Sequence, residues 1–159
     1  MKGVRDSRSL AVWSAVNPLL ERVGRTEHQA ALEGTLMPSS NLEEILNELR
    51  AREPIFHRRE FGTVREDLLR MTADDFWEIG ASGKIYEREF VISELLERYK
   101  SPEHGDLTCR DFSIRQIAED LYQLNYVLQQ PERLTRRTTL WRKASAGWTI
   151  VFHQGTVIA

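Results

Sequence analysis

Two stretches of this 159-residue sequence combine side chains that could carry out chemistry. In the first, His57 and Glu60 flank two arginines. An imidazole beside a carboxylate can act as a general base when burial shifts its pKa suitably. The alternative is a surface charge cluster, because four adjacent polar residues usually face water. The sequence leaves both interpretations open.

The second stretch is the C-terminal run LTRRTTLWRKASAGWTIVFHQGTV, residues 134–157. Its arms are rich in Thr, Val, Ile, Leu, Phe and Trp, as strands prefer, and a tight turn at Ser145-Ala146-Gly147 separates them. We therefore predict a closing hairpin. It contains Arg137, Trp141 and His153, whose side chains could together hold a small carboxylate.

Several other chemistries find little support. The four histidines, His28, His57, His104 and His153, are scattered without ligand spacing, and the single Cys109 excludes a multi-thiolate metal site. The glycines form no phosphate-binding motif, and neither a Ser-His-Asp nor a Cys-His arrangement can be argued. We predict no metal and no cofactor.

Composition excludes some partners. Lys and Arg number 22 against 24 Asp and Glu, so no strong attraction to nucleic acid or to an anionic membrane is expected. Strand alternation should also spread the basic residues around Arg137 over both faces. No apolar run approaches the length of a membrane span, and the basic opening lacks an apolar region after it. We expect a cytoplasmic protein.

The sequence divides into an N-terminal extension, residues 1–40, and a domain, residues 41–159. In the extension, apolar residues at helical spacing surround Trp13, Pro18 interrupts the pattern, and a polar linker follows. A loosely docked terminus is the simpler interpretation. A partner-binding helix anchored by Trp13 is the alternative.

The domain's patterns predict helices first and consecutive strands last. Helices are expected after possible capping boxes at Asn41 and Thr63, and a third over 87–99. Strands are expected over 74–81, 107–118 and 121–130, followed by the hairpin. This order predicts an α+β fold, with helices on one face of an antiparallel sheet. The late strands carry apolar residues on both faces, which favours a second subunit against the outer face.

The element order, the segment DFWEIGASGKIYERE and the closing RTTLWRKASAGWTIVFHQGT resemble the nuclear transport factor 2-like superfamily, particularly its ketosteroid-isomerase-like and SnoaL-like branches. The closing hairpin is also similar to the association domain of calmodulin-dependent kinases. The resemblance covers about residues 42–157. It implies a cystatin-like fold: a curved antiparallel sheet forming a cone over about three helices. It further implies an internal pocket for a small, largely apolar ligand and a homodimer through the outer sheet face.

The resemblance to kinase association domains implies that Trp141 faces this pocket. Alternation then puts Arg137 and Thr139 beside it, with Val151, His153 and Gly155 on the next strand. We predict a ligand-binding set of Trp77, Tyr126, Arg137, Thr139, Trp141 and His153. The alternative is that Trp141 is core, Arg137 is paired with a carboxylate and His153 is a structural residue.

Three functions follow as hypotheses. The first is binding of a small, partly apolar ligand, either neutral or anionic. The second is general acid–base catalysis by an isomerase, cyclase or dehydratase of the SnoaL-like type, with His153, His57 or Glu60 as catalytic candidates. The isomerase branch pairs an acidic base with a Tyr and acid oxyanion hole, and no matching Asp is identifiable here. The third is a dimeric interaction module without catalysis.

Overall fold

The computed structural model describes residues 39–102 and 105–158. The predicted extension, including Trp13, therefore lies outside the described residues, apart from Ser39 and Ser40. His28 and His104 also lie outside them. Among the helices of the described part, none is long and apolar enough to cross a membrane.

The elements follow the predicted order, with additions. The helices are α2 (Ser39–Arg50), α3 (Arg65–Met71) and α4 (Arg88–Tyr99), and two short 3-10 helices, η1 (Ile55–His57) and η2 (Arg59–Phe61), lie between the first two. The strands are β1 (Thr72–Ile79), β2 (Ile85–Glu87), β3 (Thr108–Ala118), β4 (Leu121–Gln130), β5 (Arg133–Ala144) and β6 (Gly147–Val157). The 3-10 turns and the three-residue β2 are too short to leave a periodic signal.

One helix start differs from the prediction. The backbone carbonyl of Val64 accepts the first helical bonds of α3, from the amides of Asp67 and Leu68 at 3.1 and 3.2 Å. Val64, rather than Thr63, is therefore the N-cap, and it makes no side-chain capping bond. The helix at the start of the domain likewise begins at Ser39, two residues before Asn41. Such shifts are common at helix ends.

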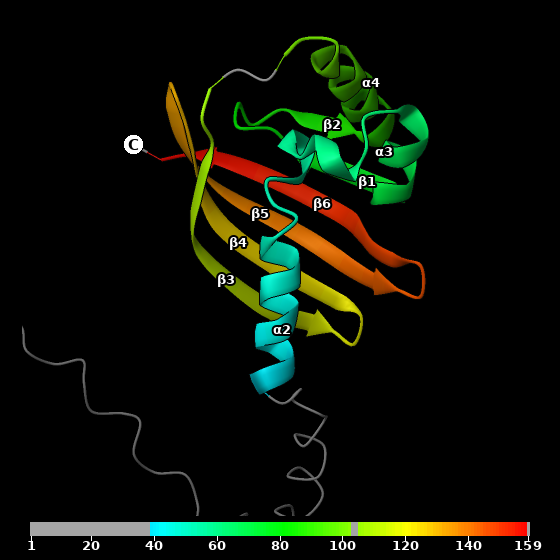
Figure 1. Ribbon diagram of the computed structural model, residues 1–159, viewed down its shortest axis with the longest axis vertical. Coiled ribbons are helices and arrows are strands. Elements are labelled where there is room, and N and C mark those ends of the chain that lie inside the picture. Colours follow the sequence, from blue (N-terminus) through cyan, green and yellow to red (C-terminus); the bar gives the residue numbers. More distant parts are fainter. Residues whose placement is uncertain (1–38, 103–104, 159) are drawn as a thin grey trace, which may run out of the picture. The chain divides into compact units, whose positions relative to one another are not determined.

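The six strands form one sheet in the order β2-β1-β6-β5-β4-β3 (Figure 1). Strands β3 to β6 are an antiparallel meander, as predicted. The sheet is nevertheless mixed, because β1 runs parallel to β6. The prediction of a purely antiparallel sheet is therefore wrong at the pairing of β1 with β6. These two strands are separated in the chain by α4 and by β3 to β5, and local sequence patterns do not determine the relative direction of strands that are so far apart.

A bulge in β6 changes which of its residues face inward. Leu140 pairs with Phe152 and Trp141 pairs with Ile150, so Val151 has no counterpart on β5. Ile150, rather than Val151, therefore lies beside Trp141, which corrects the predicted inward set at that position. Beyond the bulge, His153 and Gly155 face inward as strict alternation predicted.

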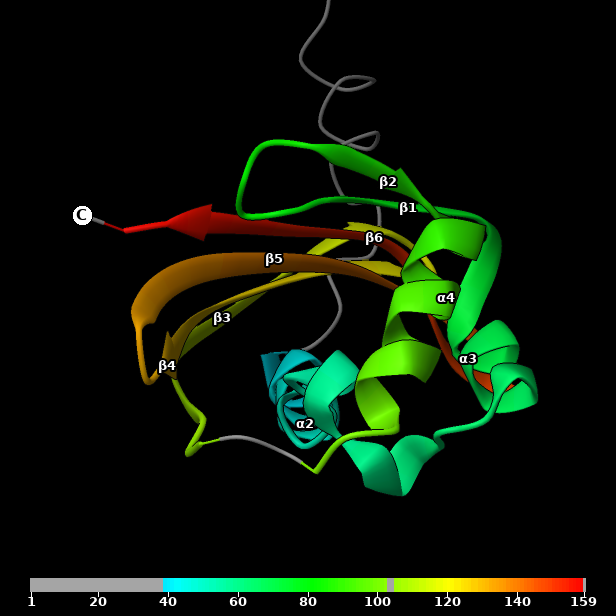
Figure 2. The ribbon, with the colours of Figure 1, turned by 90° about the horizontal axis from the view of Figure 1, so that it is seen from above.

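The core lies between the sheet and the helices, which cover the same face of it (Figure 2). The apolar stripe of α2 buries Ile45 and Leu49, and α4 buries Ile92 and Leu95. The sheet contributes a buried set of large side chains: Phe76, Tyr122, Leu124, Tyr126, Leu128, Trp141, Trp148 and Ile150. Because side chains alternate along a strand, the remaining residues of each strand lie on the outer face of the sheet, away from the helices.

Candidate functional site

Two cavities lie between the helices and the sheet and share one wall. The larger has a volume of about 750 Å³ and the smaller about 470 Å³. Residues lining both are Glu53, Pro54, Phe56, His57 and Arg98. The shared wall is thus the η1 segment, which enters through a cis Glu53–Pro54 peptide bond, together with one side chain of α4.

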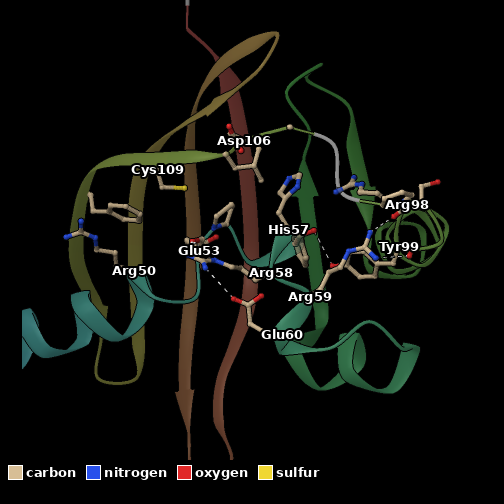
Figure 3. Close-up of a pocket in the computed structure, with 17 residues that line it drawn as sticks. Arg50, Glu53, His57, Arg58, Arg59, Glu60, Arg98, Tyr99, Asp106 and Cys109 are labelled. Atoms are coloured by element: carbon tan, nitrogen blue, oxygen red, sulfur yellow. Dashed lines mark hydrogen bonds and ion pairs between the residues drawn. The ribbon is translucent and has the colours of Figure 1, made fainter.

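Of the arginines that line the larger cavity, three are held by neighbouring protein groups: Arg50, Arg58 and Arg59 (Figure 3). Arg50 lies over the ring of Phe112 at 5.3 Å. Arg58 pairs with Glu60 at 3.3 Å and also donates to a backbone carbonyl. Arg59 donates to two backbone carbonyl groups at the end of α4 and just after it. These guanidinium groups therefore serve mainly to tie the surrounding loops together.

The smaller cavity has arginines of a different kind. Arg137 donates to Thr135 Oγ1 at 3.0 Å and to Gln130 Oε1 at 3.4 Å, and Arg133 donates to the same amide oxygen at 2.6 Å. Across the described residues, neither of them, nor Arg98, makes an ion pair with Asp or Glu. Burial lowers the pKa of Arg137 below its usual range. Such a group gains from a nearby anion.

His57 stands among these cations. Burial first, and then the charges of Arg98, Arg137, His153 and Arg133, lower its pKa to about 4. The imidazole is therefore neutral at pH 7, with one nitrogen donating and the other accepting. Its low pKa reflects burial first, and the positive charges around this cavity add to the effect.

His153 forms the second polar feature of the smaller cavity. Its Nδ1 lies 3.1 Å from Glu78 Oε2, and Phe56 meets the ring edge-on at 5.7 Å. Glu78 and Thr139 are its direct cross-strand neighbours on β1 and β5. The hydroxyl of Thr139 is buried, with no hydrogen-bond partner among the described residues. A carboxylate that holds an imidazole in one orientation is a common arrangement for general acid–base catalysis.

Glu53 is a buried carboxylate at the centre of the shared wall, only 1% exposed. Its Oε2 accepts hydrogen bonds from the hydroxyl of Tyr126 and the amide of Ile55, each at 2.9 Å. Its Oε1 accepts one from Trp141 Nε1 at 3.2 Å. Burial, followed by the charge of Glu53, raises the pKa of Tyr126 well above its usual value. This network fixes η1 against β4 and β5.

The structure brings together part of the predicted site. Tyr126, Arg137 and His153 line the smaller cavity, and His57 joins them from η1. Trp141 and Thr139 face the same side but are buried behind the lining.

Two other predicted residues lie elsewhere. Trp77 is 40% exposed on the outer face, where it packs against Phe152 at 4.6 Å, because alternation turns Phe76 inward instead. Glu60 lines only the larger cavity, where it pairs with Arg58. The His57–Glu60 pair is thus not an isolated surface cluster, but Glu60 does not line the smaller cavity that His57 shares with His153.

Sequence reasoning missed Glu53, Glu78, Arg98 and Arg133. A signal existed for Glu78, because alternation in β1 puts it on the same face as the apolar Phe76. Arg98 falls on the helical stripe of Leu95, although exposed helices commonly carry such cations. Within the described residues, no group of three or more His, Cys, Asp and Glu side chains is arranged to hold a metal ion.

Comparison with known proteins adds a fold but no activity. No protein-family model matches the sequence, and no curated protein is significantly similar to it. A protein of unknown function from Pectobacterium atrosepticum is 16% identical, with a TM-score of 0.58 over 77% of this chain and 94% of that one. A nuclear transport factor 2-like protein from Cytophaga hutchinsonii is also 16% identical, with a TM-score of 0.55 over 77% of this chain and all, 100%, of that one.

A third similar structure is a proposed ketosteroid isomerase from Parabacteroides distasonis. It is 13% identical, with a TM-score of 0.52 over 69% of this chain and 85% of that one. Identities this low establish architecture alone, because one fold of this kind carries many functions. The mixed six-stranded sheet, its helices and these likenesses show that the chain has the nuclear transport factor 2-like fold.

Proposed function

We propose that this protein binds a small, partly apolar molecule with an anionic group, such as a carboxylate, in the smaller cavity. The observation that carries the proposal is Arg137. Its guanidinium is largely buried at the cavity wall and has no carboxylate partner among the described residues. Arg98 and Arg133 lie on the same cavity and are likewise without one.

A bound carboxylate would compensate the cost of burying that charge. Hydrogen bonds from arginine to a carboxylate are charge-assisted and often bidentate. The apolar remainder of the ligand would contact the buried side chains of Phe56, Val91 and Leu95, which also line the cavity. A volume of about 470 Å³ is within the range of cavities that hold small molecules.

Isothermal titration calorimetry with small carboxylates and their matched primary amides tests this proposal. We expect the carboxylate to bind and the amide to bind weakly. Arg137→Gln should reduce carboxylate affinity by about 10- to 100-fold, as loss of a charged hydrogen bond does. Arg136→Gln is the matched control, because Arg136 is the neighbouring, exposed residue on the opposite face of β5. Equal binding of acid and amide, or equal losses in both variants, would contradict the proposal.

The pair of His153 and Glu78 supports a second candidate, general acid–base catalysis of the SnoaL-like type. His153 is only 4% exposed, lines the smaller cavity and lies 3.1 Å from Glu78. In this function, His153 would exchange a proton with a bound molecule, while Glu78 positions the ring and stabilises its charged form.

Hydrogen–deuterium exchange of a ligand tests this candidate function, general acid–base catalysis, without knowledge of the full reaction. The acidic C–H protons of a 2-oxo carboxylate should exchange into D2O faster with the protein than without it, as followed by NMR. His153→Gln should abolish the acceleration, and Glu78→Gln should reduce it, while both variants still bind the ligand. Exchange that is unaltered in His153→Gln would rule out His153 as the base.

We also propose that the protein is a cytoplasmic homodimer through the outer face of the sheet. Trp77, Phe152 and Leu140 form an apolar row on that face by the registers of β1, β6 and β5. Native mass spectrometry should give twice the monomer mass, and Trp77→Glu should yield monomers. A monomeric wild-type protein would contradict the proposal. A dimer with an empty, inert cavity would instead favour an interaction module without catalysis.

A further inference from the structure

The side of α4 that lines the smaller cavity changes character along the helix. Phe90, Glu94 and Arg98 follow each other at intervals of four residues, so they lie on one side of the helix, and all three line the cavity. Eight residues of helix correspond to about 12 Å. The cavity is therefore aromatic at the start of α4 and cationic at its end.

The aromatic end is made by two rings. Tyr86 of β2 stacks on Phe90, with ring centroids 4.9 Å apart and an angle of 8° between the ring planes. Phe90 is still 49% exposed, although it lines the cavity. A ligand ring can cover this remaining apolar surface, and contacts between aromatic rings contribute beyond the area they bury.

The other end gathers positive charge. Arg98 from the last turn of α4 is joined on the cavity by Arg133 and Arg137 of β5. All three lower the pKa of His57, so they act on a common region of the cavity. Glu94 lies between the two ends on α4, and its carboxylate would repel an anion placed there. The charges along α4 thus favour a ligand anion at the arginine end of the helix.

We propose that the ligand is an aryl-substituted carboxylate, bound with its ring at Tyr86 and Phe90 and its carboxylate at the arginines. This inference rests on the proposed binding function and adds the chemical class and the orientation. Because arginine side chains are long, a ligand shorter than the separation along the helix can reach both ends. A phenyl ring and a carboxylate joined by a short linker of a few methylene groups fit this description.

Calorimetric titration of 4-phenylbutyrate, 4-cyclohexylbutyrate and butyrate tests the inference. The phenyl and cyclohexyl acids have nearly equal apolar size, so their comparison isolates the aromatic ring. We expect the wild-type protein to prefer the phenyl acid by about 3- to 10-fold, the range for one aromatic contact. Phe90→Leu should lower the affinity for the phenyl acid to that for the cyclohexyl acid. The control is Trp77→Leu, which removes an exposed ring from the outer face.

The outcomes separate this inference from the proposed function. If butyrate and both ring acids bind, but the phenyl preference is absent or survives in Phe90→Leu, the aromatic assignment is wrong and carboxylate binding stands. If no carboxylate binds, both fail. Ring-current shifts of the Phe90 and Arg98 resonances give a second measurement. The phenyl acid should shift Phe90 strongly and Arg98 weakly, and the reverse pattern would overturn the orientation.

Discussion

Replacement of Glu53 by glutamine tests whether the buried carboxylate holds the shared wall of the cavities together. Glu53 is 1% exposed and takes hydrogen bonds on both oxygens, from Tyr126, Ile55 and Trp141. Glutamine keeps the shape but has one acceptor oxygen. Whichever way the amide is turned, its NH2 group faces at least one of these donors.

The expected cost follows from this geometry. A buried donor left without a partner costs about 1–3 kcal/mol, and the remaining bonds lose the charge that strengthened them. Removal of the charge also relieves part of its desolvation cost, which acts in the opposite direction. We expect Glu53→Gln to reduce the free energy of unfolding by about 2–3 kcal/mol.

Urea unfolding, followed by far-UV circular dichroism as well as tryptophan fluorescence, measures this change. The second probe is needed because Trp141 itself bonds to Glu53. Glu43→Gln is the control, because Glu43 is an exposed carboxylate on α2. A double-mutant cycle with Tyr126→Phe should give a coupling energy of about 1 kcal/mol or more. If Glu53→Gln is as stable as wild type, or more stable, the network does not hold the wall and the reasoning is refuted.

Three further predictions concern residues around the cavities. Burial and then Arg98 lower the pKa of His57 from 6.5 to about 4. As the pH falls from 6.5 to 4, the imidazole is protonated in the unfolded chain before it is protonated in the folded one, so the free energy of unfolding should fall by up to about 3 kcal/mol. Urea titrations at pH 7 and pH 4.5 should show a smaller loss of stability for His57→Gln than for the wild type, and an equal loss would contradict the assignment. Burial, followed by Glu53, raises the pKa of Cys109 to about 11, so its reaction with a disulfide reagent at pH 8 should be about 10-fold slower than that of a free thiol. The thiolate is about 100-fold scarcer, but the higher nucleophilicity of a more basic thiolate offsets part of this loss. A reaction at the free-thiol rate would show an accessible, unperturbed sulfur. A Cβ added at Gly155 would lie 3.2 Å from Nη1 of Arg137. Gly155→Ala should therefore displace the guanidinium and weaken carboxylate binding by about 3- to 10-fold in calorimetry. Unchanged affinity would show that Arg137 does not hold the ligand.

The local pattern of the sequence predicted the strands and helices because each depends on neighbouring residues. The meander of β3 to β6 follows from alternating apolar residues and short turns. The predicted strand over 121–130 has the bounds of β4. The bulge at Val151 could not be predicted, because it depends on how β6 pairs with β5 rather than on the composition of β6.

The site depended on partners that are distant in the chain. His153 lies 75 residues from Glu78, and Glu53 lies 73 residues from Tyr126 and 88 from Trp141. No spacing rule relates such residues, so only the register of the sheet and the position of η1 bring them together. His57 and Glu60 illustrate the converse: they are close in sequence, but Glu60 pairs with Arg58.

By itself, the sequence determined the α+β order of elements, the spacing that puts Arg137 and Thr139 on the same face of a strand as Trp141, and the absence of any local metal or phosphate motif. These depend on composition and on the two-residue period of strands. The tertiary structure decided that β1 runs parallel to β6, that Trp77 faces outward, and that three arginines without carboxylate partners among the described residues line one cavity. The physical reason is that charge and burial at a site are set by side chains from several elements, whose positions no single segment of the chain specifies.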